Sequence, residues 1–253
     1  MAGRKPLIAG NWKMFGRMAD MGRLAETAKA AGAAAQAVDI LFCPPAPLIA
    51  DFARAAKDLP IAVGAQDCAE FSDDGPYTGE VSAAMLADVG AKYVIVGHSE
   101  RRAGRAETDL QVRIKAEAVS LAGLAPIVCV GETLDARLSG KAGEVVGRQL
   151  SVSLPHAAPI GLVVAYEPIW CVGTDRTPNP KEIEGMHAQV RAALTARFGS
   201  AAERVRILYG GSVKPKNAAE ILAIEGVDGA LVGRASLNAA EFAAIISACP
   251  KAR

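Results

Sequence analysis

The chain has 253 residues, of which 28 are Lys or Arg and 27 are Asp or Glu, so its formal net charge is +1. Half of the residues are apolar (51%), and no long stretch is both poor in apolar residues and highly charged, which excludes a disordered chain. The basic residues are scattered, so we expect no nucleic-acid partner. No segment approaches the roughly 20 apolar residues of a membrane span, so we expect no membrane association.

The N-terminus and the cysteines indicate the compartment. The first residues, MAGRKPLIAG, are basic and then apolar, but the apolar run is too short for the core of a signal peptide. The five cysteines are odd in number and widely spaced, and no CxxC pair is present. The sequence therefore indicates neither a disulfide framework nor a zinc site. These features favour a cytoplasmic protein.

Eight short apolar runs predict buried strands. They are rich in Val, Ile and Leu and lack strict alternation, as expected of parallel strands covered on both faces. In chain order they span 6–10, 38–42, 61–65, 92–97, 125–131, 161–167, 204–210 and 228–233. The stretches between them have many alanines and apolar residues at helical spacing. The expected helices span 18–34, 46–59, 108–123, 143–153, 179–198, 215–224 and 238–248, with a weaker one at 82–90.

This order of elements predicts the fold. Eight strands, each followed by a crossover, recur at intervals of roughly 30 residues with no linker between them. We therefore expect a single (β/α)8 barrel domain over residues 1–253. The alternative is a doubly wound open sheet, but no GxGxxG follows the first strand and no P-loop lysine motif is present.

The ends of the seventh and eighth strands are candidates for anion binding. In a (β/α)8 barrel the active site lies at the carboxyl ends of the strands. These two strands end in GGS (210–212) and VGRAS (232–236), where backbone N–H groups can converge on an anion. We expect these two adjacent turns to bind a phosphate group, although each turn alone is also an ordinary strand-to-helix turn.

Strands one and four also end in polar side chains. His98 stands at a predicted helix start, which disfavours a cationic imidazole and keeps the ring neutral; a purely structural histidine is the alternative. Asn11 and Lys13 follow the first strand, where they supply a hydrogen-bond donor and a cation if they face the site. Taken alone, they are a turn residue and a surface cation. We expect His156 and His187 to lie on the surface.

Glu167, at the end of the sixth strand, is the strongest candidate for a general base. Pro168 follows it directly, and a loop with Gly173 leads to Pro178 and Pro180. Rigid ends around a tip of small residues suit a lid that moves as a unit. Closure of a lid would strip water from the carboxylate and raise its pKa, which makes it a stronger base. The alternative is a carboxylate that merely pairs with a neighbour.

Five motifs together resemble the triosephosphate isomerase family over nearly the full length of the chain. They are AGNWKM (9–14), VGHSERR (96–102), AYEPIWCVGT (165–174), YGGSV (209–213) and LVGRASL (231–237), in the family's order and spacing. The resemblance implies an isomerase of glycolysis and gluconeogenesis. It would interconvert dihydroxyacetone phosphate and D-glyceraldehyde 3-phosphate, with no metal and no cofactor.

The resemblance also implies a role for each candidate. Glu167 would move a proton between adjacent carbons of the substrate, and neutral His98 would polarise the carbonyl and serve the oxygens of the enediolate, as is known of the family. Asn11 and Lys13 would stabilise the developing negative charge. The phosphate would be held by the backbone N–H groups of Gly173, Ser212, Gly233 and Arg234.

The family is usually a homodimer, in which a loop after the third strand reaches the partner's site. Residues 64–80 correspond to that loop, with Thr78 near its tip, and the length of the loop supports a functional role. Several positions depart from the family pattern. Phe15 replaces a small polar residue, Arg234 a common second glycine and Ala106 a glycine. The lid residues that differ are Cys171, Asp175 and Arg176.

Two other functions stay open at this point. An aldolase on the same fold would need a lysine projecting from a strand, but Lys13 lies just past strand one and Lys92 stands at a strand entry. A non-catalytic phosphate-binding protein would be expected to lack the base or the histidine, whereas this chain keeps both Glu167 and His98.

Overall fold

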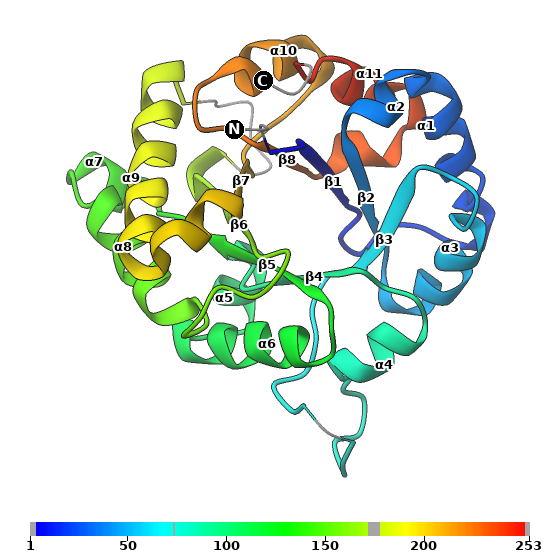
Figure 1. Ribbon diagram of the computed structural model, residues 1–253, viewed down its shortest axis with the longest axis horizontal. Coiled ribbons are helices and arrows are strands. Elements are labelled where there is room, and N and C mark those ends of the chain that lie inside the picture. Colours follow the sequence, from blue (N-terminus) through cyan, green and yellow to red (C-terminus); the bar gives the residue numbers. More distant parts are fainter. Residues whose placement is uncertain (1–3, 73, 172–177, 251–253) are drawn as a thin grey trace.

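A computed structural model describes residues 4–72, 74–171 and 178–250. Its eight parallel strands form a closed barrel in sequence order, and β1 pairs with β8 to complete the ring (Figure 1). The strands are β1 (Leu7–Asn11), β2 (Asp39–Cys43), β3 (Ile61–Ala65), β4 (Tyr93–Val96), β5 (Ala125–Val130), β6 (Val163–Tyr166), β7 (Arg206–Tyr209) and β8 (Gly229–Val232). The predicted (β/α)8 barrel is confirmed.

Helices surround the barrel on all sides (Figure 1). The α-helices are α1 (Arg23–Ala31), α2 (Ala34–Ala37), α3 (Ile49–Ala55), α4 (Ala83–Asp88), α5 (Ser99–Gly104), α6 (Asp109–Leu121), α7 (Leu134–Leu138), α8 (Ala142–Ser153), α9 (Pro180–Phe198), α10 (Pro215–Ala223) and α11 (Ala239–Ser247). Short 3-10 helices are η1 (Met18–Asp20), η2 (Ala46–Leu48), η3 (Ile169–Cys171), η4 (Gly199–Arg204) and η5 (Arg234–Leu237).

The core has two shells because each strand residue faces either the barrel interior or the helices. One cluster of buried side chains fills the interior of the barrel; it includes Leu7, Leu41, Ile127, Val163 and Leu208. The other, larger cluster lies between the strands and the helices. Both faces of the strands are thus apolar, which explains the lack of alternation in their sequences.

The predicted helices agree with the structure, with local differences. The stretch 18–34 is interrupted, because α1 ends just before Gly32, whose φ of 53° is readily adopted by glycine. The stretch 46–59 begins as the 3-10 helix η2. The short helix α7 has no buried residue, so its sequence shows no apolar periodicity and no helix was expected there.

The surface position expected for His187 is wrong. Its side chain is fully buried in α9, where it packs edge-on against the Tyr166 ring at a centroid distance of 6.0 Å. Its Nδ1 lies 3.0 Å from the carbonyl oxygen of Gly226. Burial lowers the pKa of the His187 imidazole to about 4. His156, in contrast, is exposed as expected.

None of the five cysteines is in a disulfide bond, and four of them are buried; Cys249 is partly exposed. In the described part of the chain, no helix is long and apolar enough to cross a membrane. Nor do the described side chains form a group of three or more His, Cys, Asp or Glu residues that could hold a metal ion.

Candidate active site

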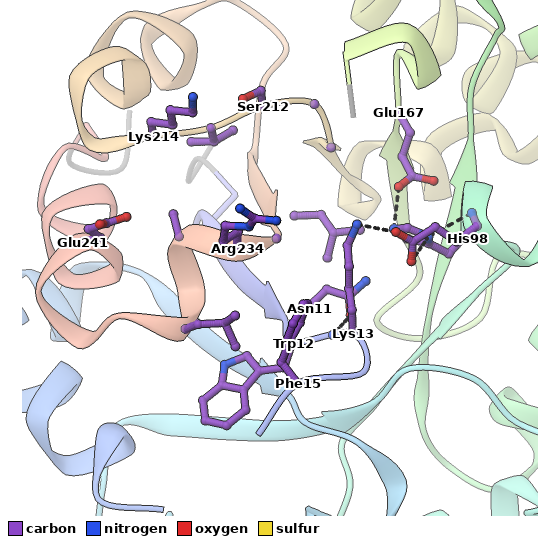
Figure 2. A pocket seen from close by; sticks show the side chains of 18 residues that line it. Asn11, Trp12, Lys13, Phe15, His98, Glu167, Ser212, Lys214, Arg234 and Glu241 are labelled. Carbon is purple, nitrogen blue, oxygen red and sulfur yellow. Dashed lines mark hydrogen bonds and ion pairs between the residues drawn. The ribbon is translucent and has the colours of Figure 1, made fainter. Parts of the chain in front are cut away.

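A cavity of about 620 Å³ opens at the carboxyl ends of the strands (Figure 2). All the predicted site residues that the structure describes line it, although they come from five different strand ends. They are Asn11, Lys13, His98, Glu167, Ser212, Gly233 and Arg234. Gly173, the remaining predicted residue, lies outside the described part of the chain, as do Asp175 and Arg176.

Glu167 is held rigidly by the strands on both sides. Its backbone N–H donates to the Val130 carbonyl at 2.8 Å, and the Gly210 N–H donates to the Tyr166 carbonyl at 2.7 Å. The side chain is 2% exposed. A Cβ atom at Gly210 would lie 2.9 Å from Cγ of Glu167, so a residue with a side chain at Gly210 would displace the carboxylate.

The carboxylate of Glu167 and the imidazole of His98 are in direct contact. Nε2 of His98 lies 2.9 Å from Oε1 of Glu167, and the Ser99 N–H donates to Oε2 at 3.0 Å. The other ring nitrogen, Nδ1, accepts a hydrogen bond from the Glu100 N–H at 3.2 Å, because His98 caps the start of α5. Since a nitrogen that accepts carries no proton, Nε2 bears the ring proton and donates it to Glu167.

Each member of this pair shifts the pKa of the other. Burial alone lowers the pKa of the His98 imidazole, but the Glu167 carboxylate outweighs burial and raises it above its ordinary value. Burial alone raises the pKa of Glu167, but His98 reverses the effect and the pKa is lowered. The sequence predicted a neutral imidazole, and a carboxylate whose pKa rises when a lid closes over it. The bond to Nδ1 favours the neutral ring, whereas the contact between His98 and Glu167 favours the imidazolium and the ionised carboxylate.

Lys13 is fixed by several polar contacts at the mouth of the cavity. Its Nζ lies 2.5 Å from Oε1 of Glu100, and its backbone N–H donates to Oδ1 of Asn11 at 3.0 Å. Nε2 of Gln66 donates to the Lys13 carbonyl at 2.8 Å. The φ angle of Lys13 is 54°, which few residues other than glycine adopt. Oδ1 of Asn11 thereby accepts a hydrogen bond, and its amide N–H groups, for which the described residues offer no partner, can donate to a ligand.

The turns after β7 and β8 form the opposite side of the cavity, where Ser212, Lys214 and Arg234 stand away from Glu167 and His98 (Figure 2). Nδ2 of Asn217 donates to the Ser212 carbonyl at 3.0 Å and secures the first turn. Oγ of Ser236 donates to the Gly233 carbonyl at 2.7 Å and secures the second. The cavity thus has one end that holds the Glu167–His98 pair and an opposite end that carries the cations Lys214 and Arg234.

Known proteins are similar to this chain over almost its whole length. The family model described as triosephosphate isomerase matches residues 6–249. The triosephosphate isomerase of Afipia carboxidovorans is 57% identical over 248 residues, which cover 97% of this chain and 98% of the relative. That of Xanthobacter flavus is 50% identical over 248 residues, covering 98% of each. The chain belongs to the triosephosphate isomerase family.

A solved structure agrees with this assignment to the triosephosphate isomerase family. The crystal structure of triosephosphate isomerase from Bartonella henselae has a TM-score of 0.89 and 41% sequence identity. The match covers 96% of this chain and 98% of the crystallised chain.

Sequence reasoning overlooked several polar residues around this triosephosphate isomerase family site. Ser99 and Glu100 hold the catalytic candidates through backbone N–H groups, and Glu100 also binds Lys13. Their position directly after His98, at a helix start, is a signal that could have identified them. Glu132 is fully buried and accepts hydrogen bonds from the Tyr166 hydroxyl at 3.1 Å and from Trp170 Nε1 at 3.0 Å. Glu132 therefore secures the chain on both sides of Glu167.

Proposed function

We propose that this protein interconverts dihydroxyacetone phosphate and D-glyceraldehyde 3-phosphate through an enediolate, a reaction of glycolysis and gluconeogenesis. Membership of the triosephosphate isomerase family supports the reaction. The observation that carries the proposal is the contact of a buried carboxylate with a buried imidazole in the cavity, where Oε1 of Glu167 lies 2.9 Å from Nε2 of His98. These are the two groups that a proton transfer between neighbouring carbon and oxygen atoms requires.

Glu167 is the proposed base. It removes a proton from the carbon beside the carbonyl and returns it to the neighbouring carbon. The second step deprotonates Glu167 again, so each cycle ends with the carboxylate form. A substrate that enters between Glu167 and His98 separates the two side chains. Loss of the imidazole as a partner, in a buried environment, raises the pKa of Glu167 and makes it a stronger base.

His98 is the proposed electrophile. Its Nε2–H, which donates to Glu167 in the absence of a competitor, donates to the carbonyl oxygen once substrate is bound. Separation from Glu167 removes the influence that raises the pKa of His98, and the Glu100 N–H continues to occupy Nδ1. The neutral ring can then polarise the carbonyl and exchange protons with both oxygens of the enediolate.

The remaining polar groups stabilise charge. The Lys13 ammonium and the Asn11 amide lie where negative charge develops on the substrate oxygens, and both are held in place before the reaction. Turns at Ser212 and at Gly233–Arg234 are proposed to bind the phosphate through their N–H groups, together with Gly173. No step calls for a metal or a cofactor.

We also propose that the chain works as a single-domain homodimer in the cytoplasm, with loop 64–80 entering a partner's site. Large apolar side chains are exposed around that loop and near Lys13, which a second copy would cover. They are Met14, Phe15, Met18, Phe71, Tyr77 and Met85. Light scattering is expected to give twice the chain mass of 26.1 kDa; a monomer at micromolar concentration would contradict the dimer.

The test of the reaction is a coupled assay of glyceraldehyde 3-phosphate turnover with the wild type and Glu167→Asp. Aspartate keeps the carboxylate but withdraws it by one methylene, and a misplacement of about 1 Å costs on the order of 100-fold in rate. We expect high activity in the wild type and a loss of at least that size in the variant. Equal rates would show that Glu167 is not the base. Borohydride trapping of Lys13 on dihydroxyacetone phosphate would instead indicate an aldolase.

A further inference from the structure

Arg234 places a side-chain cation in the cavity that Glu167 and His98 also line. It is the first residue of η5, directly after the Gly233 turn, and its side chain is exposed. Figure 2 shows the guanidinium directed from η5 into the cavity, toward the side where Lys13 stands. The backbone N–H of this residue is already part of the proposed phosphate site; the side chain adds a group with a chemistry of its own.

The guanidinium of Arg234 differs from those of the arginines that hold the barrel together. Arg102 donates to two carbonyls, to Asp109 and to Ser153, and Arg206 binds a carboxylate and a tyrosine hydroxyl. For Arg234 no hydrogen bond or ion pair is found within the ranges that the structure describes. Glu241 lines the same part of the cavity, but no ion pair of 4.0 Å or less joins it to Arg234. The five donors of Arg234 are therefore available to a ligand.

The surroundings indicate which ligand the guanidinium suits. Lys13, the cation across the cavity, is already bound to Glu100 at 2.5 Å. Arg234 instead shares the side of the cavity that carries Ser212 and Lys214, away from Glu167 (Figure 2). This is the side on which the proposed substrate places its phosphate. A planar guanidinium matches two phosphate oxygens at once, whereas a backbone N–H contacts only one.

We propose that the Arg234 side chain binds the phosphate dianion of the substrate, in addition to the backbone N–H groups of the two turns. The inference rests on the proposed function for the identity of the substrate, but phosphate binding itself can be measured without turnover. The consequence is a stronger selection for the dianionic phosphate ester over an unphosphorylated triose, and a stronger inhibition by free phosphate.

The experiment measures the dissociation constant of inorganic phosphate by calorimetry, at constant ionic strength, for the wild type and three variants. Arg234→Gln removes the charge, and Arg234→Lys keeps a charge but lacks the planar guanidinium that can bind two oxygens. Arg204→Gln is the control; it removes one exposed arginine at the opposite end of the barrel, just before β7. We expect the dissociation constant to rise about tenfold for Arg234→Gln, less for Arg234→Lys, and less than twofold for Arg204→Gln.

Kinetics supply the second measurement. We expect kcat/KM of Arg234→Gln to fall about tenfold further on glyceraldehyde 3-phosphate than on glyceraldehyde, which lacks the phosphate. A dissociation constant within twofold of the wild type, or an equal fall on both substrates, would overturn the inference. If the wild type binds phosphate through Arg234 but does not isomerise the ester, the proposed function fails and the phosphate site remains.

Discussion

His98 and His187 are both buried, with 6% and 0% of their surface exposed, yet their environments shift the imidazole pKa in opposite directions. His187 contacts a backbone carbonyl through Nδ1, and its Nε2 has no partner in the described chain. His98 contacts a carboxylate through Nε2 and a backbone N–H through Nδ1. Burial penalises the cation at both sites, but at His98 the carboxylates of Glu167 and, to a smaller extent, Glu100 outweigh it.

The comparison teaches that burial alone does not decide the direction in which the pKa of an imidazole shifts. His187 is neutral because burial outweighs the Gly226 carbonyl and the Asp228 carboxylate, which both favour the cation, so its pKa is lowered. His98 is balanced between burial, which favours the neutral ring, and Glu167, which favours the cation. A ligand that separates His98 from Glu167 changes that balance, and this sensitivity is what acid–base catalysis requires.

The largest expected effect separates the two histidines by activity. His98→Gln is expected to lose 10²- to 10⁴-fold in kcat, the usual loss when an acid–base group is removed, and still to bind a phosphate-bearing analogue. His187→Gln is the matched control; it should keep kcat and lose stability instead, because it buries an amide without partners. The coupled isomerase assay and calorimetric binding of the analogue check both outcomes. Full turnover in His98→Gln would refute the role of the imidazole.

The pH dependence of stability sharpens the comparison. The folded-state pKa of His187, about 4, lies below its ordinary value of 6.5, so the unfolded chain binds this proton more readily. Its contribution to stability is therefore present above pH 6.5 and is lost as the pH falls toward 4. Since each unit of pKa shift corresponds to about 1.4 kcal/mol, the loss amounts to about 3 kcal/mol at most. His98, whose pKa is raised, contributes with the opposite sign.

Urea unfolding from pH 7 to pH 4 measures this contribution. The wild type should lose stability across this range more steeply than His187→Gln, which has no imidazole to titrate in α9. Parallel curves of stability against pH for the two proteins would show that burial does not lower the pKa of His187.

The smallest expected effect concerns the backbone of the segment that begins at His98. This segment runs through α5 to Ala106, which has a φ of 53°; the described part of α9 contains no such residue. An alanine in this region is strained by roughly 1–2 kcal/mol, and glycine recovers part of that, so Ala106→Gly should stabilise by about 0.5–1 kcal/mol. The control is Ala103→Gly within α5, which should destabilise by about 1 kcal/mol. Thermal unfolding measures the stability change of each variant. Changes of the same sign in Ala106→Gly and Ala103→Gly would contradict backbone strain at Ala106.

Much of the fold and of the cavity could be predicted because the signals are local. Each strand is a short apolar run, and the residues after parallel strands must meet at one end of a barrel, which brings Asn11, His98 and Glu167 together. Even the burial of His187 has a local signal that we overlooked. It lies between Met186 and Val190 on the stripe of buried residues of α9, where helical spacing predicts an inward position.

The rest could not be predicted because it depends on contacts between distant residues. Lys13 binds Glu100 across 87 positions of sequence, and Ser99 reaches Glu167 across 68. No spacing rule indicates which carboxylate neutralises a given lysine, or that the Arg234 side chain turns into the cavity. The opposite pKa shifts of His98 and Glu167 depend mainly on their mutual contact of 2.9 Å, with smaller effects of Glu100 on His98 and of Ser99 and Lys13 on Glu167, and these contacts exist only in the folded chain.

The burial of the thiols has a practical consequence for handling the protein. A thiolate reacts with oxidants and alkylating agents far faster than a thiol. Burial raises the pKa of Cys68 to about 12 and raises those of Cys43 and Cys129 as well, so these sulfur atoms stay protonated and enclosed at neutral pH. Cys249, just beyond α11, is the one cysteine that is partly exposed. Partial burial raises the pKa of Cys249 to about 11 as well, so its accessibility, and not its thiolate character, makes it the first cysteine that a reagent reaches. A fluorophore or surface tether is therefore expected to attach at Cys249 first.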